Sequence, residues 1–351
     1  MIHNNILFHN VVDLDPAPGG GVYVRRFPED VRNIMCPLGK LVAQESSGCE
    51  LRFVTESESF CLALSCRANL LSPWESHAAD VMVFKGAFFH SLHRLEAGKI
   101  NYLQITDIGG ANKNAFSNLK EEVRNSDYFH HNVWRVMLGR YTAIFHELDT
   151  YGAALRIPRV DEIPKKKILF YGSSITHGAC PTVYHLCYVQ QTARLLKADA
   201  LNQGLSGSCY CEKEVADYLA ERQDWDLICL ELGVNMRNGF TPEEFKARSS
   251  YLVRRIVKAH PDKPVVLITI YPNGESVQNT GCAGDATKRQ LEFDRILREL
   301  KAELGPAKIH LIEGSSVLKD YNGVAKDLIH PSDYGHMDMG YNLSMQLKAI
   351  I

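Results

Sequence analysis

Residues 167–178 read Lys-Ile-Leu-Phe-Tyr-Gly-Ser-Ser-Ile-Thr-His-Gly, an apolar run that ends in a glycine–serine turn. A short apolar run bounded by turn residues is typical of a strand buried on both faces. Helical segments separate it from four further apolar runs, which are Ala200–Asn202, Leu227–Leu232, Val265–Ile270 and Ile309–Ile312. Alternating buried strands and helices predict a parallel sheet covered by helices, in which ligands bind beyond the carboxyl ends of the strands.

The helical segments carry their own local signals. Thr241-Pro242-Glu243-Glu244 combines a capping box with proline in the first turn, so a helix is expected to begin there. In the segment from Asp285 to Leu304, apolar side chains recur on one helical stripe, at Phe293, Ile296, Leu300 and Leu304.

Residues 1–157 have a different pattern, with short strand-like runs separated by turns and few helical periods. The clearest runs are Glu50–Thr55, Phe60–Cys66, Val81–His90 with a Lys-Gly turn, Ile100–Ile105, Val133–Leu138 and Thr142–Leu148. Such density of short strands predicts an antiparallel β-sandwich. Residues 158–166 contain two prolines and several charges, which indicates a linker. We therefore expect a sandwich domain over 1–157 and a catalytic domain over 167–351.

The composition excludes several classes of protein. The formal net charge of −2 argues against a nucleic-acid partner, and no apolar run is long enough for a membrane helix. Residues 1–5 lack the pattern of a signal peptide. The ten cysteines are scattered, mostly in apolar stretches, which favours free thiols in a reducing cytoplasm. Cys209-Tyr210-Cys211 is too tightly spaced for a common zinc site, so neither a metal nor a cofactor is expected.

Polar residues follow the predicted strands at the points where a site would form. Gly172-Ser173-Ser174 follows the first strand, residues 202–208 follow the second, and Gly233-Val234-Asn235 follows the third. Asp327-Leu328-Ile329-His330-Pro331 lies near the end of the sequence. Each block alone is a weak signal, since serine, glycine and asparagine are common in turns. Their combination at successive strand ends predicts one shared site.

These residue types suit nucleophilic catalysis. A serine hydroxyl needs a base within hydrogen-bond reach, and histidine oriented by a carboxylate is the usual one. We expect Ser174 as the nucleophile, His330 as the base and Asp327 as its partner. The N–H groups of Ser174 and Gly207, with the side-chain amide of Asn235, are expected to form an oxyanion hole.

The four blocks resemble those of the SGNH hydrolases, also called GDSL-type esterases. In that family the serine lies in a Gly-Asp-Ser block, and the oxyanion groups are a glycine and an asparagine, matched here by Gly207 and Asn235. Its last block, Asp-x-x-His-Pro, is matched by Asp327 and His330. The resemblance covers about residues 167–351. It implies a flavodoxin-like three-layer sheet and a serine esterase that forms an acyl-enzyme without a cofactor.

Ser173 departs from the family pattern, because it stands where an aspartate is usual. The strand-rich first half resembles the jelly-roll-like sandwich that precedes this domain in some two-domain carbohydrate esterases. The resemblance implies a short-chain ester substrate, an acetyl ester on a carbohydrate being the expected case.

Two other functions use the same sequence features. Transfer of the acyl group to an alcohol or amine would make the protein an acyltransferase. An inactive glycan-binding protein would instead use aromatic residues of the sandwich, with Trp74, Trp134 and Tyr102 as candidates. The expected partner is a small-molecule or oligosaccharide ester, and a homo-oligomer is possible.

Several other residues near the strand ends are candidates for substrate contacts. His177, Tyr210 and Tyr271 are expected to touch substrate, although His177 also suits a polar position in a helix and Tyr210 a structural role. Glu231 is expected either as a buried hydrogen-bonded carboxylate or as a strand-end residue facing the site. His336 and Asp338 are expected in the first turn of the last helix.

Overall fold

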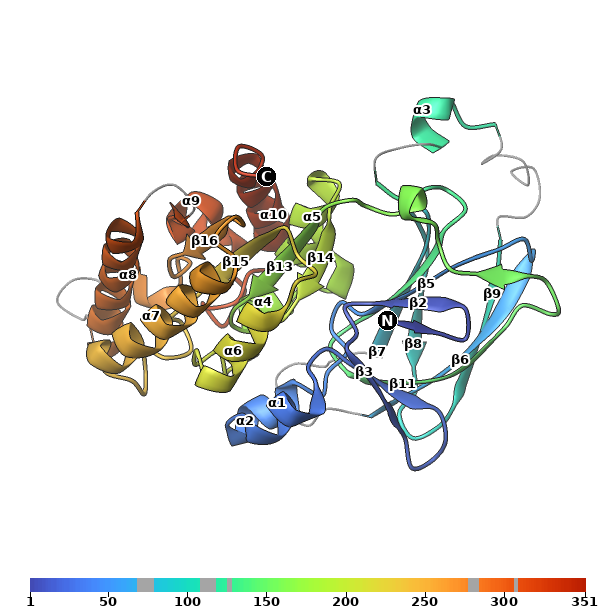
Figure 1. Cartoon of the computed structure of the whole chain (residues 1–351), viewed down its shortest axis with the longest axis horizontal. Helices are drawn as coiled ribbons and strands as arrows, with labels where there is room; N and C mark the ends of the chain where they lie inside the picture. Colours follow the sequence, from blue (N-terminus) through green and yellow to red (C-terminus); the bar gives the residue numbers. More distant parts are fainter. Residues whose placement is uncertain (68–78, 108–117, 125–127, 277–283, 306–308) are drawn as a thin grey trace. The chain divides into compact units, whose positions relative to one another are not determined.

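A computed structural model describes residues 1–67, 79–107, 118–124, 128–276, 284–305 and 309–351. The chain forms two compact units (Figure 1). The sandwich unit comprises Met1–Pro28 and Gln44–Lys165, and the α/β unit comprises Glu29–Ala43 and Lys166–Ile351. Residues 29–43 therefore fold with the second half of the sequence, a feature that the sequence did not indicate.

The sandwich unit consists of two antiparallel sheets, as expected. One has the order β1-β2-β5-β10-β7-β8, with β12 also paired to β5, and the other has the order β3-β4-β11-β6-β9. The strands are β1 (Ile2–His3), β2 (Ile6–His9), β3 (Asp13–Pro16), β4 (Val22–Arg25), β5 (Glu50–Thr55), β6 (Ser59–Arg67), β7 (Ala79–Lys85), β8 (Phe88–Leu95), β9 (Asn101–Thr106), β10 (Trp134–Leu138), β11 (Thr142–Asp149) and β12 (Leu155–Arg156). A short helix, α3 (Glu121–Arg124), and a 3-10 turn at Val160–Glu162 complete it.

The core of this unit lies between the two sheets. Leu51 and Val136 of one sheet share a buried apolar cluster with Leu62 and Phe145 of the other. Trp134 is completely buried and packs edge-on against Phe60. Trp134 is thus a core residue and offers no stacking surface to a glycan, whereas Tyr102 is exposed. Trp74 lies outside the described residues.

The α/β unit is built on a five-stranded parallel sheet with the order β14-β13-β15-β16-β17. In sequence this is the order 2-1-3-4-5, so the flavodoxin-like prediction is confirmed. Its strands are β13 (Lys167–Tyr171), β14 (Asp199–Asn202), β15 (Leu227–Glu231), β16 (Val265–Ile268) and β17 (Ile309–Ile312). Nearly every residue of these strands is buried, which is why they read as continuous apolar runs.

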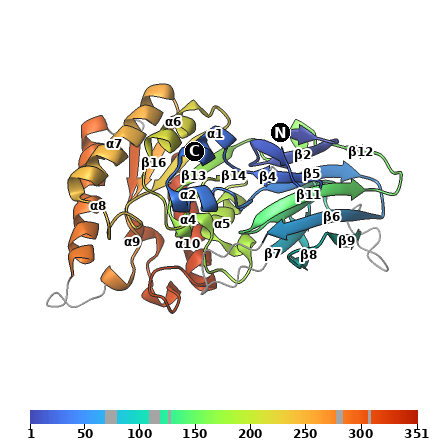
Figure 2. The same ribbon diagram turned by 90° about the horizontal axis from the view of Figure 1, so that it is seen from below.

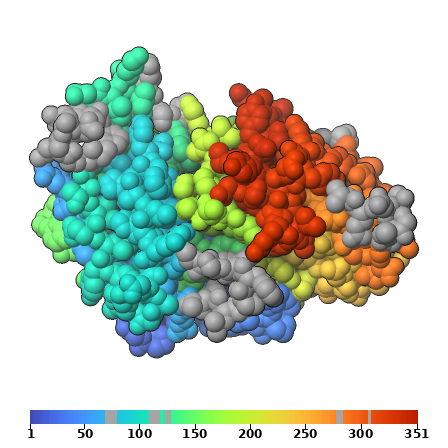
Figure 3. Space-filling view, turned by 180° about the vertical axis from the view of Figure 1, so that it is seen from behind, coloured from blue at the N-terminus to red at the C-terminus, as the bar shows by residue number. Residues whose placement is uncertain are grey.

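Helices cover both faces of the parallel sheet (Figure 2). The neighbours α6 (Lys213–Glu221), α7 (Pro242–Ala259) and α8 (Asp285–Leu304) pack in sequence, while α5 (Tyr188–Leu195) packs on α10 (Asp333–Leu347). In Figure 3, the surfaces of α5 (yellow-green) and α10 (red) lie side by side. The remaining helices are α1 (Glu29–Ile34), α2 (Pro37–Val42), α4 (Ser174–His177) and α9 (Gly314–Val317), with 3-10 turns at Tyr184–Leu186, Gly274–Ser276 and Tyr321–Gly323.

A local signal in the sequence explains where α7 begins. The capping box of α7 is formed as expected, because Thr241 accepts from the N–H of Glu244 and Glu244 accepts from the N–H of Thr241. Within the described part of the chain, no helix is long and apolar enough to cross a membrane. All the cysteines in that part are free thiols.

Candidate active site

Ser174 lies at the carboxyl end of β13, in the turn that leads into α4. Ser173 caps this short helix, since its hydroxyl accepts a hydrogen bond from the N–H of Ile175. Ser174 is the first residue of α4, so its N–H has no partner within the helix and is available to a ligand. Gly178 ends the helix in a left-handed conformation, with φ of +94°. The serine side chain is thereby held at the mouth of the sheet.

A hydrogen-bonded chain connects Ser174 to Asp327. Oγ of Ser174 lies 2.7 Å from Nε2 of His330, and Nδ1 of the same ring lies 2.6 Å from Oδ2 of Asp327. Partial burial disfavours the charged form of Asp327, but the hydrogen bonds that it accepts from His330 and from the N–H of Ile329 outweigh this and lower its pKa. Asp327 therefore stays ionised at neutral pH, as a partner for an imidazolium must.

The backbone between Asp327 and His330 is unusual. Leu328 has φ of +60°, a left-handed conformation that costs a leucine about 1 kcal/mol. This local turn lets Oδ1 of Asp327 accept the N–H groups of both Ile329 and His330, at 2.9 and 3.0 Å. The sequence indicated that the two residues share a turn, but the strain at Leu328 has no signature in the sequence.

The groups predicted for the oxyanion hole lie in the loops after β14 and β15. Gly207 has φ of +65°, a conformation that favours glycine, and no hydrogen bond within the described residues uses its N–H. Oδ1 of Asn235 accepts the N–H of Cys209 at 3.2 Å. Because this contact occupies the carbonyl end of the Asn235 amide, its NH2 group is left to donate to a ligand.

Glu231 is buried beneath the serine turn, which resolves the two alternatives that the sequence left open. Its Oε2 accepts the N–H of Ser173 at 2.6 Å and the hydroxyl of Thr176 at 3.0 Å. Thr176 is in turn hydrogen-bonded to the hydroxyl of Tyr188 at 2.6 Å. Burial raises the pKa of Glu231 to about 7 in spite of these hydrogen bonds. Glu231 thus supports the turn from below and does not face the ligand.

The residues expected to touch substrate divide into two groups. The side chain of His177 is fully buried, with Nδ1 2.8 Å from the hydroxyl of Ser206. Tyr271 is also buried and packs edge-on against Tyr188. Neither offers a surface to a substrate in this structure. Tyr210 is only half-buried and packs against Phe240, with ring centroids 5.0 Å apart.

His336 lies in the first turn of α10 as expected but is buried, whereas Asp338 lies in the second turn. His336 accepts the N–H of Tyr188 at Nδ1, and its Nε2 lies 2.8 Å from the carbonyl oxygen of Ala179. Burial lowers the pKa of His336 to about 4, so it is neutral. His336 fixes the segment after α4 to the last helix.

One group of possible metal ligands was found in the described part of the chain. Sγ of Cys180 and ligand atoms of Asp327 and His330 all lie within 4.8 Å of one another. The Asp327 and His330 atoms are already hydrogen-bonded to each other, so a metal ion would compete with the contact that orients the histidine. We assign no metal to these residues.

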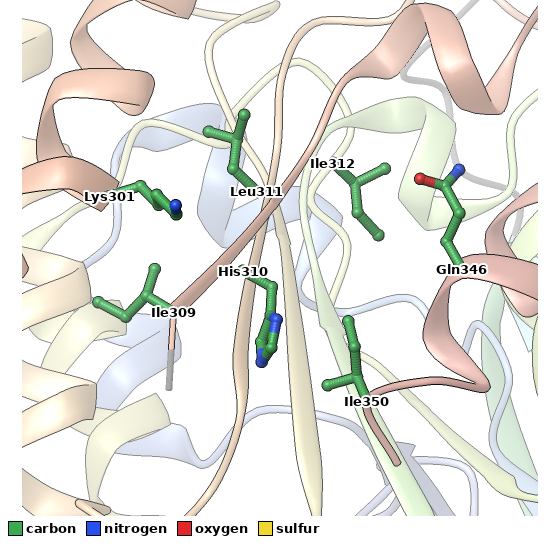
Figure 4. Close-up of a pocket in the computed structure, with 7 residues that line it drawn as sticks. All are labelled: Lys301, Ile309, His310, Leu311, Ile312, Gln346 and Ile350. Carbon is green, nitrogen blue, oxygen red and sulfur yellow. The ribbon is translucent and has the colours of Figure 1, made fainter. Parts of the chain in front are cut away.

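A separate hollow lies at β17, the edge strand of the parallel sheet. It is lined by Lys301 of α8, all four residues of β17, and Gln346 and Ile350 at the end of the chain (Figure 4). None of the residues predicted for the site lines it. The hollow is therefore distinct from the site around Ser174.

Comparisons with known proteins agree with this geometry. The model of the GDSL-like lipase/acylhydrolase family matches residues 165–348. The chain therefore belongs to the GDSL-like lipase/acylhydrolase family. By class it is a serine esterase of the SGNH type. No match was found among curated proteins.

Three solved structures show how widely the two-unit fold is shared. The salicylyl-acyltransferase SsfX3 from a tetracycline biosynthetic pathway has a TM-score of 0.79 and 17% identity, over 99% of this chain and 95% of that one. A GDSL-like lipase from Bacteroides ovatus has a TM-score of 0.70 and 21% identity, over 99% and 98%. A family two carbohydrate esterase from Clostridium thermocellum has a TM-score of 0.61 and 14% identity, over 98% of each. At these identities the likeness establishes the fold alone.

Proposed function

We propose that the protein hydrolyses a short-chain ester, with acetyl esters of carbohydrates as the expected substrates, through an acyl-enzyme on Ser174. His330 takes the proton of the Ser174 hydroxyl as its oxygen attacks the ester carbonyl. Asp327 holds the imidazole and stabilises its charged form. The N–H groups of Ser174 and Gly207 and the amide of Asn235 bind the developing oxyanion. Loss of the alcohol gives the acyl-enzyme, which water then hydrolyses.

The observation that carries this proposal is the continuous hydrogen-bonded chain from Ser174 through His330 to Asp327, with both distances below 2.8 Å. A serine whose N–H makes no hydrogen bond to the described part of the chain, and whose hydroxyl contacts an oriented imidazole, is prepared for acyl transfer. Glu231 and Thr176 hold the backbone of the turn from below, so the geometry does not depend on the substrate.

Substitution of Ser174 by alanine tests the nucleophile. Hydrolysis of p-nitrophenyl acetate is expected to fall by on the order of 10⁶-fold in Ser174→Ala, as for the loss of a triad serine elsewhere. A fluorophosphonate should label the wild-type chain at Ser174 and leave the variant unlabelled. Thermal unfolding checks that both proteins are folded. Equal rates in the two folded proteins would exclude Ser174 as the nucleophile.

Substitution of Asn235 tests the oxyanion hole. Asn235→Ala is expected to lower kcat by about 10²–10³-fold, with a much smaller change in KM, because its donor acts on the transition state. Asn238 lies in the same loop and is exposed, so Asn238→Ala is the matched control and should retain full activity. An unchanged kcat in Asn235→Ala would remove Asn235 from the mechanism.

The proposed acetyl ester substrate is supported by structures of similar fold. Several structures with the same two-unit fold are described as family two carbohydrate esterases. Release of acetate from acetylated oligosaccharides, measured beside hydrolysis of p-nitrophenyl esters of increasing chain length, tests the proposal. Long-chain esters cleaved much faster than acetate esters would contradict it.

A second candidate is acyl transfer to an alcohol or amine, because the structural match with a TM-score of 0.79 is described as an acyltransferase. The acyl-enzyme on Ser174 would be common to both reactions, and only the group that resolves it differs. Mass analysis of the products formed with and without sugar or amine acceptors separates the two. New ester or amide at the expense of free acid would favour transfer.

A further inference from the structure

Residues 29–43 form a helical excursion that belongs to the α/β unit although it precedes most of the sandwich in sequence. The excursion contains α1 and α2, and α1 packs against α6 (Figure 1). Family membership rests on residues 165–348 and does not include it. The excursion is thus an addition to the catalytic unit that the motif-bearing half of the sequence does not contain.

Glu212 anchors the excursion next to the loop that carries Gly207. Its Oε1 accepts the N–H of Cys36 at 2.8 Å, and Glu212 is the residue directly before α6. Cys36 in turn caps α2, since its sulfur accepts the N–H of Gly39 at 3.3 Å. These contacts fix the first turn of α2, and therefore the position of Leu38 within it.

Leu38 lies directly against the backbone of Gly207. An ideal Cβ placed on Gly207 would be only 2.9 Å from Cδ2 of Leu38. An ester carbonyl oxygen that accepts the N–H of Gly207 would lie about 2.9 Å from its nitrogen. The carbon next to the carbonyl group would then lie within about 5 Å of that nitrogen. Leu38 is only partly buried, so apolar surface remains for a ligand to cover.

Two aromatic residues lie in the loops that follow β14 and β15, the loops that carry Gly207 and Asn235. The rings of Tyr210 and Phe240 pack together, and Arg248 lies over Phe240 while donating to the carbonyl oxygen of Tyr210 at 3.2 Å. Burial, together with the nearby Cys36 thiol and Glu212, raises the pKa of Tyr210. Tyr210 therefore remains neutral at physiological pH.

We infer that Leu38 of the excursion contacts the acyl group bound at Ser174 and limits its length. This inference rests on the proposed function, since it needs an acyl group in the oxyanion hole. A leucine side chain beside Gly207 gives a short acyl group an apolar contact and fills the space into which a longer chain would extend. The excursion thereby sets acyl specificity without taking part in the chemistry.

Acyl-chain profiles of Leu38 variants test the inference in the full-length protein. The value of kcat/KM for p-nitrophenyl acetate, butyrate and hexanoate is compared in wild type, Leu38→Ala and Leu38→Met. Each methylene of the acyl chain that gains an apolar contact is expected to raise kcat/KM about fourfold. In Leu38→Ala we expect the hexanoate-to-acetate ratio to rise on the order of tenfold, through KM more than kcat. Leu38→Met conserves volume and should keep the wild-type profile.

Leu41 provides the matched control, because it is a leucine of the same helix with about half of its surface exposed. Leu41→Ala should leave the profile unchanged. Labelling of Ser174 by short-chain and long-chain alkyl fluorophosphonates gives a second readout that does not need turnover. Should the Leu38→Ala ratio equal that of wild type in an active enzyme, the inference alone is wrong. If no fluorophosphonate labels Ser174 and the protein hydrolyses no ester, the proposed function is wrong and the inference fails with it.

Discussion

Ser173 and Glu231 together define the serine turn at the scale of single residues. Ser173 stands where the family pattern has an aspartate, and its backbone N–H donates to the buried carboxylate of Glu231. The other oxygen of this carboxylate, Oε1, makes no hydrogen bond among the described residues. A carboxylate with an unpartnered buried oxygen is costly to ionise, which accounts for the raised pKa of Glu231.

This ionisation predicts how stability depends on pH. Because the pKa of Glu231 is about 7 in the folded protein and lower when unfolded, the folded state binds the extra proton. The contribution of the neutral acid is present below pH 4.5 and is lost as the pH rises to about 7, at a cost on the order of 3 kcal/mol. Glu231→Gln, which cannot ionise, should lose this part of the pH dependence.

Denaturant unfolding at pH 5 and pH 8 measures the effect. Between pH 5 and pH 8, Glu231→Gln is expected to lose less unfolding free energy than wild type. Glu221, which is exposed at the end of α6, supplies the control Glu221→Gln, with no such change. Identical pH dependence in wild type and Glu231→Gln would show that Glu231 is ionised throughout this range.

The residues of the site differ in how far the sequence could predict them. The predicted catalytic and oxyanion residues all follow strands or precede the last helix, so their proximity follows from the topology of a parallel sheet. They are Ser174, Gly207, Asn235, Asp327 and His330. The burial of His177 and Tyr271 depends on how the loops fold back, which strand positions do not specify. Leu38 gave no signal, because its closeness to Gly207 depends on a contact between segments far apart in sequence.

At the scale of elements, the segments with a continuous, alternating or helical apolar pattern were the most predictable. β13, β17, β5 and α8 begin and end where their apolar patterns do. The strands β1–β4 and the helices α1 and α2 were not predicted. Their sequences mix polar, glycine and proline residues with the apolar ones, as in Asp-Leu-Asp-Pro of β3 and Pro-Leu-Gly-Lys-Leu-Val of α2, and hold no clear apolar period. Their formation depends on tertiary contacts such as that between Cys36 and Glu212.

The loop after β14 packs closely against α4 at Gly204, which predicts how α4 responds to a substitution there. A Cβ added to Gly204 would lie 2.3 Å from the backbone nitrogen of His177, which cannot move aside without shifting α4. Gly204→Ala is expected to cost about 2 kcal/mol or more in unfolding free energy and to lower ester hydrolysis further than the loss of folded protein explains. Ser174 is on the same short helix and would be displaced.

Gly239 serves as the control for this substitution. Nothing lies within 4 Å of a Cβ added there, and the residue does not have positive φ. Gly239→Ala should change both unfolding temperature and activity little. Normal activity and stability in Gly204→Ala would mean that the loop and α4 are less tightly packed than this structure has them.

At the scale of the whole molecule, the α/β unit is discontinuous in sequence. A chain of residues 166–351 would carry all the family motifs but would lack α1, α2 and the Cys36 N–H that Glu212 accepts. We expect this truncated chain to unfold at a lower temperature than the full-length protein and to hydrolyse esters with relaxed acyl-length preference. Thermal unfolding and the acyl-chain profile measure both effects.

A cut chain of full sequence controls for the break in the backbone, because it keeps both the sandwich unit and residues 29–43. Val160 is highly exposed, so a protease site placed there allows cleavage after folding. Because residues 29–43 remain part of the α/β unit, the two fragments should stay associated and retain the wild-type acyl profile. If the truncated chain were as stable and as selective as the cut protein, the excursion would have neither role.

Residues 29–43 also have a consequence for biosynthesis. They leave the ribosome long before α6 and the loop that carries Gly207 exist, and at 5–20 residues per second this delay is on the order of ten seconds or more. The α/β unit therefore cannot be completed as one uninterrupted stretch of nascent chain. For the same reason, no contiguous gene segment encodes this form of the catalytic unit without also encoding most of the sandwich, and recombination that moves only the motif-bearing half would transfer the chemistry without Leu38.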